Sequence, residues 1–145
     1  MLTTKILNSN DINLVFQLIN LYKKVFEIKE DIPTEEYLSS FINKPNDIIG
    51  VVIMDNKVLG GYTAYILPSI YRDIPDIYLY DLAVDSDYQG QGLGKNLIQS
   101  LKEYAKSISA RSMYCHTDVD SIQANEFYQR RGFYLVNVQE YRIEV

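Results

Sequence analysis

The chain has 145 residues, of which 47% are hydrophobic and 23% are charged, a size and balance that indicate one globular domain, residues 1–145, around a single core. Its formal net charge of −5 argues against a protein that binds nucleic-acid phosphates and weakly favours a cationic partner. One cysteine and one histidine exclude an internal disulfide and a zinc site, and without a long apolar run we expect a soluble, cytoplasmic, metal-free protein that does not bind a membrane.

The first forty residues combine strand and helix periodicity. Residues 3–7 predict a short strand. An apolar stripe at helical spacing follows, which predicts a helix capped by Ser9 or Asn10 that ends near Phe26. Residues 34–43 predict a second helix, because a proline precedes them and two glutamates stand in the first turn.

Strand patterns dominate the middle of the chain. Residues 48–54 and 58–67 are apolar runs separated by three polar residues, which predicts an antiparallel hairpin. Residues 77–84 are rich in β-branched and aromatic side chains and predict a central strand. A glycine-rich stretch then leads to an amphipathic helix over residues 95–108 and a strand over residues 111–117.

The end of the chain predicts one more helix and a return to the sheet. The helix covers residues 121–131 and stops at Gly132, a residue suited to the left-handed conformation that ends many helices. Residues 133–145 then alternate apolar and polar side chains, as a strand does. Together the elements predict a mixed α/β or α+β domain.

Three of the seven glycines lie within QGQGLGK, directly before a predicted helix. The free N–H groups of such a loop and of the first helical turn can form an anion site, to which the lysine adds charge. The stretch fails the P-loop pattern, and its glycine spacing fails the dinucleotide fingerprint. A surface turn that caps the helix is the alternative. The residues expected to bind a pyrophosphate are Gln89, Gly90, Gln91, Gly92, Leu93, Gly94 and Lys95.

This stretch and the last predicted helix resemble the GNAT superfamily of N-acetyltransferases. The acyl-coenzyme A loop of that family reads Q/R-x-x-G-x-G/A, which Gln89, Gly92 and Gly94 fit. A helix that ends in a tyrosine shortly before Gly-Phe is matched by Tyr128. The resemblance implies an α+β fold with a mostly antiparallel, twisted sheet of six to seven strands and about four flanking helices. It also implies acetyl-coenzyme A as the cosubstrate.

Three more segments, residues 25–41, 58–68 and 77–84, look like the small aminoglycoside 3-N-acetyltransferase branch of this superfamily. The resemblance implies acetyl transfer to a primary amine of a small cationic acceptor, with an aminoglycoside as one candidate. The chain departs from the branch at positions where the branch carries carboxylates, namely Ile66, Ser121 and Ile122. Fewer carboxylates would weaken recognition of a polycation, so the resemblance supports acetyl transfer more strongly than any one acceptor.

Acetyl transfer to an alkylamine requires that the amine first lose a proton, at a cost of roughly 4 to 5 kcal/mol at pH 7, so a base or a water relay is expected. Asp81, within an otherwise apolar strand, is the first candidate for the base, and a turn-capping aspartate is the alternative. Asp118 is interpreted either as holding the amine or as capping the last helix. Tyr80 and Asp76 complete the residues expected to bind the acceptor.

The resemblance gives Tyr128 the role of protonating the departing thiolate, for which a phenol with a pKa near 10 is suited. A core tyrosine is the alternative interpretation. The pantetheine arm is expected in a slot where two neighbouring strands part, along Leu82, Ala83 and Val84, with a backbone N–H there facing the developing oxyanion. Asn125 is a further candidate for binding the cofactor.

Two other functions fit the same residues. The chain could be a regulatory module that binds an acyl-coenzyme A without turnover, or a nucleotide-binding α/β domain in which Asp118 contacts a ribose. Cys115 and His116 are adjacent on a predicted strand and therefore point to opposite faces, which excludes a nucleophile and base pair. A homodimer is left open.

Overall fold

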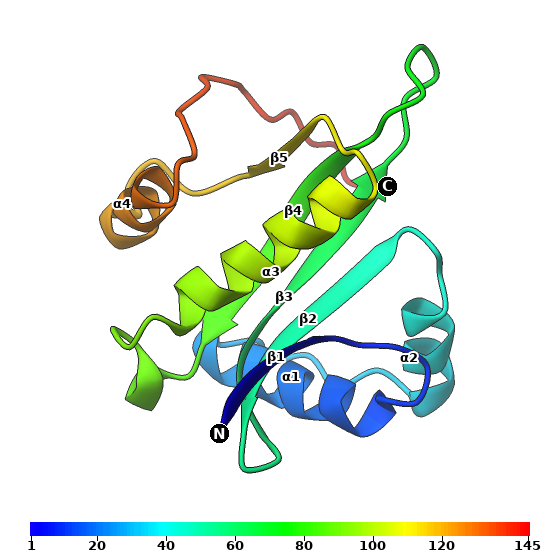
Figure 1. Ribbon diagram of the computed structural model, residues 1–145, viewed down its shortest axis with the longest axis vertical. Coiled ribbons are helices and arrows are strands. Elements are labelled where there is room, and N and C mark those ends of the chain that lie inside the picture. The colour runs from blue at the N-terminus through cyan, green and yellow to red at the C-terminus, as the bar shows by residue number, and fades with distance from the viewer.

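Five strands form one sheet in which the order along the chain is also the order in space, β1-β2-β3-β4-β5 (Figure 1). In this computed structural model, which describes residues 1–145, neighbouring strands are antiparallel except for β4 and β5, which are parallel. None of the helices has the length and apolar character needed to cross a bilayer. The strands are β1 (Leu2–Ile6), β2 (Asp47–Met54), β3 (Lys57–Leu67), β4 (Asp76–Val84) and β5 (Ser112–Cys115). The helices are α1 (Ile12–Val25), α2 (Glu35–Ile42), α3 (Leu93–Ser107) and α4 (Ile122–Arg130), with a 3-10 turn, η1 (Ser86–Tyr88), before α3.

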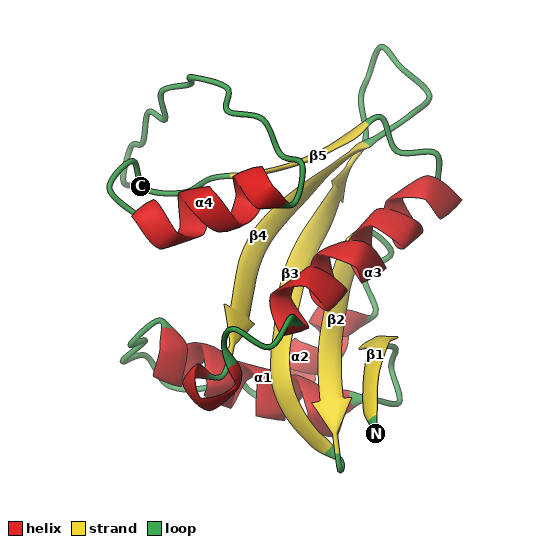
Figure 2. Ribbon diagram, turned by 60° about the vertical axis from the view of Figure 1, so that its left-hand side comes forward, coloured by secondary structure: helices red, strands yellow, loops and turns green.

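Helices cover both faces of this sheet, α1 and α2 on one face and α3 on the other (Figure 2). The α3 side has a cluster of 12 buried residues that includes Tyr62 and Leu97. The side of α1 and α2 has a cluster of 10 that includes Leu18 and Val51. The sheet therefore separates two cores, and a side chain on β4 must face one or the other.

Local sequence explains several element ends. Thr34 caps α2 by accepting a hydrogen bond of 3.2 Å from the Tyr37 N–H. Asp55 and Asn56, both with positive φ, form the two-residue turn of the β2–β3 hairpin, which confirms the predicted antiparallel pair. Gly132 follows α4 with a φ of 95°, as predicted for a helix terminator.

A β-bulge in β4 changes which face its side chains point to. β3 pairs with Asp81 and next with Leu79, so Tyr80 is an extra residue. Before the bulge, Leu79 belongs to the cluster on the α3 side, whereas after it Leu82 packs there. Asp81 consequently faces α1 and α2. In a regular strand, Asp81 would share the α3 face with Leu79, two residues earlier.

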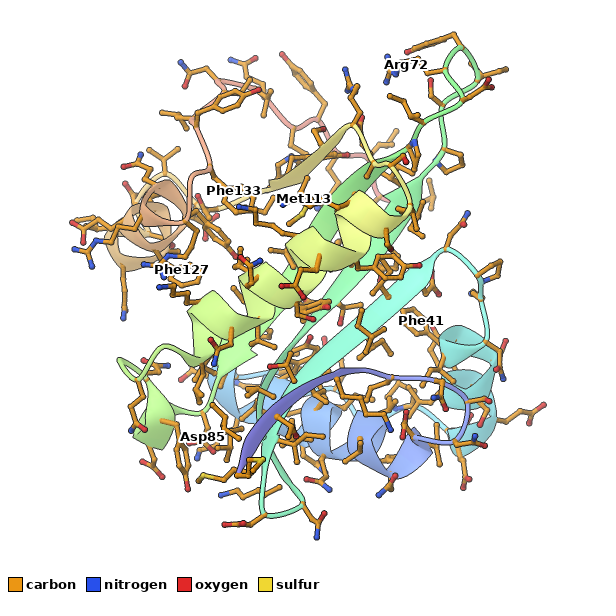
Figure 3. The ribbon with its side chains drawn as sticks, in the orientation of Figure 1. Phe41, Arg72, Asp85, Met113, Phe127 and Phe133 are labelled. Carbon is orange, nitrogen blue, oxygen red and sulfur yellow. The ribbon has the colours of Figure 1, made fainter.

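The chain after Ala105 adds β5 to the edge of the sheet but contributes no buried residue to either core. All 28 buried residues lie at or before Ala105. The later elements pack on the α3-side cluster through partly buried side chains, among them Met113, Phe127 and Phe133 (Figure 3). This part of the molecule is therefore held by its contacts with the core, not by a core of its own.

The expected number of strands is wrong, because the sheet has five strands and not six to seven. Residues 133–145, expected to return to the sheet, form no strand, and none of residues 134–145 makes a backbone-to-backbone hydrogen bond. Their alternating side chains suit a sheet, but no strand edge pairs with them, and Tyr134 and Val138 are exposed. The mixed α+β class and the four helices agree with the prediction.

The cap of α1 also differs from the prediction. Asp11 is the N-cap residue, in place of Ser9 or Asn10. Its carboxylate accepts hydrogen bonds from the Asn8 N–H at 2.9 Å and from Lys5 Nζ at 2.7 Å. The Asp11 side chain thus fixes the turn between β1 and α1, although it makes no capping bond to the helix itself.

Candidate active site

β4 and β5 separate part-way along their length. Their parallel pairing runs from Asp76 with Ser112 to Leu79 with Cys115 and ends there. From that point, residues 80–84 have β3 on one side and no strand on the other. Leu82, Ala83 and Val84, the residues expected to line the pantetheine arm, lie in this stretch. Their unpaired backbone groups can bind an extended ligand in the way that a neighbouring strand would.

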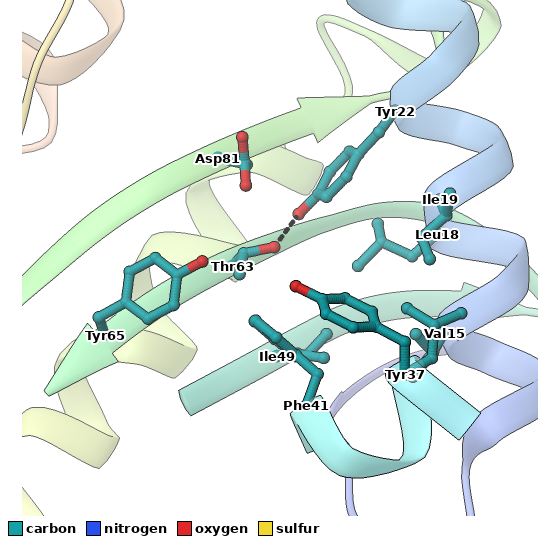
Figure 4. Close-up of a pocket in the computed structure, with 11 residues that line it drawn as sticks. Val15, Leu18, Ile19, Tyr22, Tyr37, Phe41, Ile49, Thr63, Tyr65 and Asp81 are labelled. Carbon is teal, nitrogen blue, oxygen red and sulfur yellow. Dashed lines mark hydrogen bonds between the residues drawn. The ribbon is translucent and has the colours of Figure 1, made fainter. Parts of the chain in front are cut away.

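Asp81 lies at this separation, directly after the bulge. Its side chain lines a cavity of about 160 Å³ on the side of α1 and α2 (Figure 4). Burial raises the pKa of Asp81 above the ordinary aspartate value, and a hydrogen bond with Thr63, its cross-strand neighbour, offsets part of that shift. A carboxylate with a raised pKa is a better proton acceptor near neutral pH.

Hydroxyl groups surround the Asp81 carboxylate. The hydroxyls of Tyr22 on α1 and Thr63 on β3 are hydrogen-bonded to each other at 2.9 Å. Burial, with a smaller contribution from the charge of Asp81, raises the pKa of Tyr22 well above its usual value and that of Tyr65 to about 12. Both phenols are therefore neutral at physiological pH and act here as hydrogen-bonding groups.

Tyr128 projects from α4 toward the end of β5. Its ring packs edge-on against Phe127 and Phe133, with ring centroids 5.2 and 5.3 Å away. Burial raises the pKa of Tyr128 above its usual value, the neighbouring Cys115 raises it further, and burial also raises the pKa of Cys115 to about 11. Because Cys115 is the last residue of β5 that pairs with β4, Tyr128 lies at the same separation as Asp81.

The glycine loop follows β4 and leads into α3. Gly90 and Gly92 have φ values of 77° and 84°, and nothing lies within 4 Å of a Cβ added at either, so the backbone conformation and not crowding requires glycine there. No backbone N–H from Gly90 to Lys95 donates to a carbonyl of the chain. Gly94 differs, because a Cβ there would lie 3.0 Å from the ring of Phe127.

Positive side chains from two helices meet beside this loop. Lys95 and Lys102 of α3, Arg130 of α4 and Arg131, which directly follows α4, line a cavity of about 220 Å³. Arg131 lies over the ring of Phe127 at 5.5 Å, and its Nε is buried without a hydrogen-bond partner. In a chain of net charge −5, this local excess of cations is suited to a phosphate group.

Asp76 is the first residue of β4, five residues before Asp81. Its carboxylate accepts hydrogen bonds from Arg111 at 2.8 and 3.0 Å and from the Ser112 hydroxyl at 2.8 Å, and Arg72 lies 3.8 Å away. The bond to Arg111 is the main reason that the pKa of Asp76 is lowered. This carboxylate therefore holds β4, β5 and the β3–β4 loop together.

Asp118 lies in the turn before α4, and Asn125 lies in the first turn of α4. The Asn125 amide donates to the carbonyls of Asp118 and Val119, both at 3.3 Å, and its oxygen accepts from the Thr117 hydroxyl. Asp118 is exposed, and its side chain does not cap α4. The Asn125 side chain thus stabilises the turn before α4, while the carboxylate of Asp118 makes no side-chain contact that would prevent it from binding a ligand.

The tyrosines of the sheet divide between its two faces. Tyr80 is 59% exposed and lies on the same face of the sheet as the cavity. Its ring centroid is 5.7 Å from that of Tyr65 and 5.6 Å from that of Tyr78. Tyr62 is buried on the α3 side, where its hydroxyl is hydrogen-bonded to that of Ser100 at 3.2 Å. Only the first group can contact a ligand beside Asp81.

A model of the acetyltransferase (GNAT) family matches residues 15–133, a span that includes the separation of β4 and β5, the glycine loop and Tyr128. The chain belongs to this family. The match confirms the resemblance seen in the sequence and supports the prediction of an acetyl-coenzyme A-dependent N-acetyltransferase.

Curated relatives of this GNAT chain are longer than it is. N-alpha-acetyltransferase 30 of Schizosaccharomyces pombe is 34% identical over 95 residues, which are 65% of this chain and 56% of that protein. N-acetylaspartate synthetase of Xenopus tropicalis is 27% identical over 103 residues, 71% of this chain and 36% of that protein. The chain thus spans little more than half of the first protein and about a third of the second.

Solved structures agree with the GNAT fold over almost the whole chain. The aminoglycoside acetyltransferase meta-AAC0020, from an uncultured soil metagenomic sample, has a TM-score of 0.96 and 32% identity, covers 99% of this chain and 96% of its own, and is known in complex with trehalose and with sisomicin. HMB0005, from a similar source, has a TM-score of 0.93 at 24% identity and covers 100% of this chain and 99% of its own. The first likeness supports the aminoglycoside acetyltransferase branch that the sequence indicated.

Sequence reasoning missed two parts of this GNAT site. One is the cationic cluster that adds Lys102, Arg130 and Arg131 to the glycine loop. Lys95 and Lys102 are seven residues apart, on one face of a helix, but nothing local shows that α4 faces them. The other is the cavity wall from α1 and α2, whose apolar residues were indistinguishable from ordinary core positions.

Proposed function

We propose that this GNAT chain transfers the acetyl group of acetyl-coenzyme A to a primary amine of a small cationic acceptor, by direct attack in a ternary complex. The observation that carries the proposal is the placement of Asp81 and Tyr128 at the separation of β4 and β5. Asp81 faces α1 and α2, and Tyr128 packs on the α3 side. A base and an acid on either side of one slot are what attack by an amine on a thioester requires.

The residues around the slot fit the phosphate-rich end of the cosubstrate. Unpaired N–H groups from Gly90 to Lys95 would hold the pyrophosphate, as loops at helix N-termini do. Lys102, Arg130 and Arg131 would neutralise the remaining phosphate, and the buried Arg131 Nε without a partner would gain an acceptor. Acetyl-coenzyme A itself supplies the activated acetyl group and a thiol leaving group.

Asp81 and Tyr128 divide the proton transfers. The ammonium of the acceptor must lose a proton that costs roughly 4 to 5 kcal/mol at pH 7, and Asp81, whose pKa burial raises, would accept it directly or through water. Tyr128, whose pKa burial also raises, keeps its proton at neutral pH and would donate it toward the departing sulfur. Leu82, Ala83 and Val84 would align the cosubstrate with their free backbone groups.

An aminoglycoside is one candidate acceptor. The support is the likeness to meta-AAC0020, which was solved with sisomicin bound, together with the negative charge of this chain. Tyr80, beside the cavity, and the free carboxylate of Asp118 would contribute to binding an amine of this kind.

Two measurements on the purified protein test the proposal. Acetyl-coenzyme A should raise the melting temperature, whereas NAD and ATP should not, because only a ligand that binds the folded state stabilises it. A panel of primary amines with detection of released thiol should then show turnover that depends on the amine. Stabilisation without turnover for any amine would favour a regulatory acyl-coenzyme A-binding module, and stabilisation by NAD or ATP would favour a nucleotide-binding domain.

A further inference from the structure

The cavity beside Asp81 has a mostly apolar lining and a single charged group. Of the 11 residues that line it, nine are hydrophobic, and Asp81 is the only charged one. They come from α1, α2, β2, β3 and β4, so the cavity lies between the two N-terminal helices and the sheet. Its volume of about 160 Å³ is close to the roughly 150 Å³ at which an apolar protein cavity takes up a benzene-sized molecule.

The polar and apolar parts of this cavity face each other. At one end lies the Asp81 carboxylate, beside Thr63 and Tyr22, whose hydroxyls are hydrogen-bonded to each other at 2.9 Å. The opposite wall is formed by Val15 and Ile19 of α1 with Phe41 of α2 (Figure 4). A ligand that fills the cavity therefore meets a single charge, that of Asp81, a few tyrosine and threonine hydroxyls, and mostly carbon along the opposite wall.

Other carboxylates do not supplement Asp81 inside the cavity. Asp76 is engaged by Arg111, and Glu140 forms an ion pair with Arg142 at 2.7 Å. Asp47 pairs with Tyr65 across the β2–β3 ladder and does not line the cavity. Inside the cavity a polycation would find a carboxylate for one ammonium group only, and any further ammonium group there would lie against apolar walls, which is costly for an unpaired charge.

We propose that the preferred acceptor is a monoamine with one compact apolar group of about the size of a phenyl ring or a branched five-carbon chain. The apolar group would occupy the wall formed by Val15, Ile19 and Phe41, and the amine would lie at Asp81. This proposal rests on the acetyltransferase function proposed above and narrows its acceptor class. Binding in this way removes apolar surface from water, which favours such an amine over a polar one of equal charge.

The test compares amines at fixed acetyl-coenzyme A, with thiol release as the readout. We expect kcat/KM for 2-phenylethylamine and 3-methylbutylamine to exceed that for ethanolamine by about tenfold or more, since several carbons are buried. Spermidine and sisomicin should be poorer than either apolar amine. If spermidine or sisomicin is the better substrate, the apolar-acceptor proposal is overturned and the acetyltransferase function stands. If no amine supports thiol release, both fail.

Changing the wall sharpens the test. Ile19→Phe should fill the cavity and lower the ratio of kcat/KM for 2-phenylethylamine to that for ethanolamine by about fivefold or more. Ile19→Ala should enlarge it and shift the preference toward amines with a longer apolar group, so a result is obtained even if the larger side chain impairs folding. Ile108→Ala makes the same truncation on the other face of the sheet, where Ile108 packs on the α3-side cluster, and should leave the ratio unchanged. Equal ratios in all three variants and the unchanged protein would overturn the proposal.

Discussion

The chain up to Ala105 and the chain beyond it carry different halves of the proposed site. The first part holds every buried residue and positions Asp81 and the glycine loop. The second part packs on it through partly buried side chains and positions Tyr128, Arg130 and Arg131. The proposed base is thus fixed on a central strand, whereas the proposed acid is on a helix without a buried residue of its own. Stability and activity should therefore respond differently to changes in the two parts.

Truncation of the core should give the largest effect. Leu97 is completely buried, and Leu97→Ala should lower the free energy of unfolding by about 3 to 5 kcal/mol, because a cavity is left in a packed core. Met113→Ala, in the second part, should cost about 1 kcal/mol or less, since Met113 is only partly buried and its surroundings can adjust. Urea unfolding measures both. Equal losses would show that the second part is as tightly packed as the first.

Removal of the Asp81 carboxylate should have the next largest effect, and this effect should be on activity and not on stability. Asp81→Asn should lower turnover by about a hundredfold or more, the range for loss of a general base, with partial recovery at higher pH as more amine is unprotonated. The pKa of Asp81 is raised on folding. The ionised carboxylate therefore destabilises the folded state at pH values above the pKa of the folded state, and this destabilisation is lost as the pH falls below the pKa of the unfolded state. Asp81→Asn should consequently not reduce stability at neutral pH. Normal rates for a good amine from about pH 6 to 9 would leave Asp81 as a structural hydrogen-bonding group.

Loss of the Tyr128 hydroxyl should have a smaller effect on turnover. Tyr128→Phe keeps the ring packed against Phe133 and removes only the proton donor, so kcat should fall by about tenfold or more. The dissociation constant for acetyl-coenzyme A, measured by calorimetry, should change little, because the hydroxyl acts on the departing thiolate. Tyr134→Phe is the matched control, since Tyr134 is 86% exposed. An unchanged kcat in Tyr128→Phe would assign Tyr128 to packing.

The smallest effect concerns the contact between the two parts. Gly94→Ala would place a Cβ 3.0 Å from the Phe127 ring, so that ring must move by a few tenths of an ångström, and the cost in stability should be about 1 kcal/mol. Because Tyr128 is the next residue on α4, we expect kcat to fall a few fold. The double variant Gly94→Ala, Phe127→Leu relieves the contact and should recover part of the loss. A double variant with the same kcat as Gly94→Ala alone would show that the contact with Phe127 does not cause the loss of activity.

Features set by local sequence were predictable, and features set by pairing were not. The β2–β3 hairpin and the termination of α4 at Gly132 follow from residue types with definite backbone preferences. The strand expected over residues 133–145 is wrong because alternation shows that a segment suits a sheet and not that a strand edge pairs with it. Tyr128 was named from a resemblance and Asp81 from its place within an apolar strand, but the cavity beside Asp81 depends on α1 and α2 meeting over β3, which no local pattern encodes.

The bulge at Tyr80 also determines what kinds of mutation β4 can accept during evolution. Tyr80 is the one residue of β4 without a partner in the ladder with β3, so its deletion would leave Leu79 and Asp81 adjacent and on opposite faces, as they are now. Deletion of a paired residue on either side would instead turn part of the strand to the opposite face, which would displace a core side chain such as Leu79 or the carboxylate of Asp81. Tyr80 is also 59% exposed, so its replacement disturbs neither core. Selection on the length of this strand should therefore be weakest at its extra residue and stricter at the paired residues beside it.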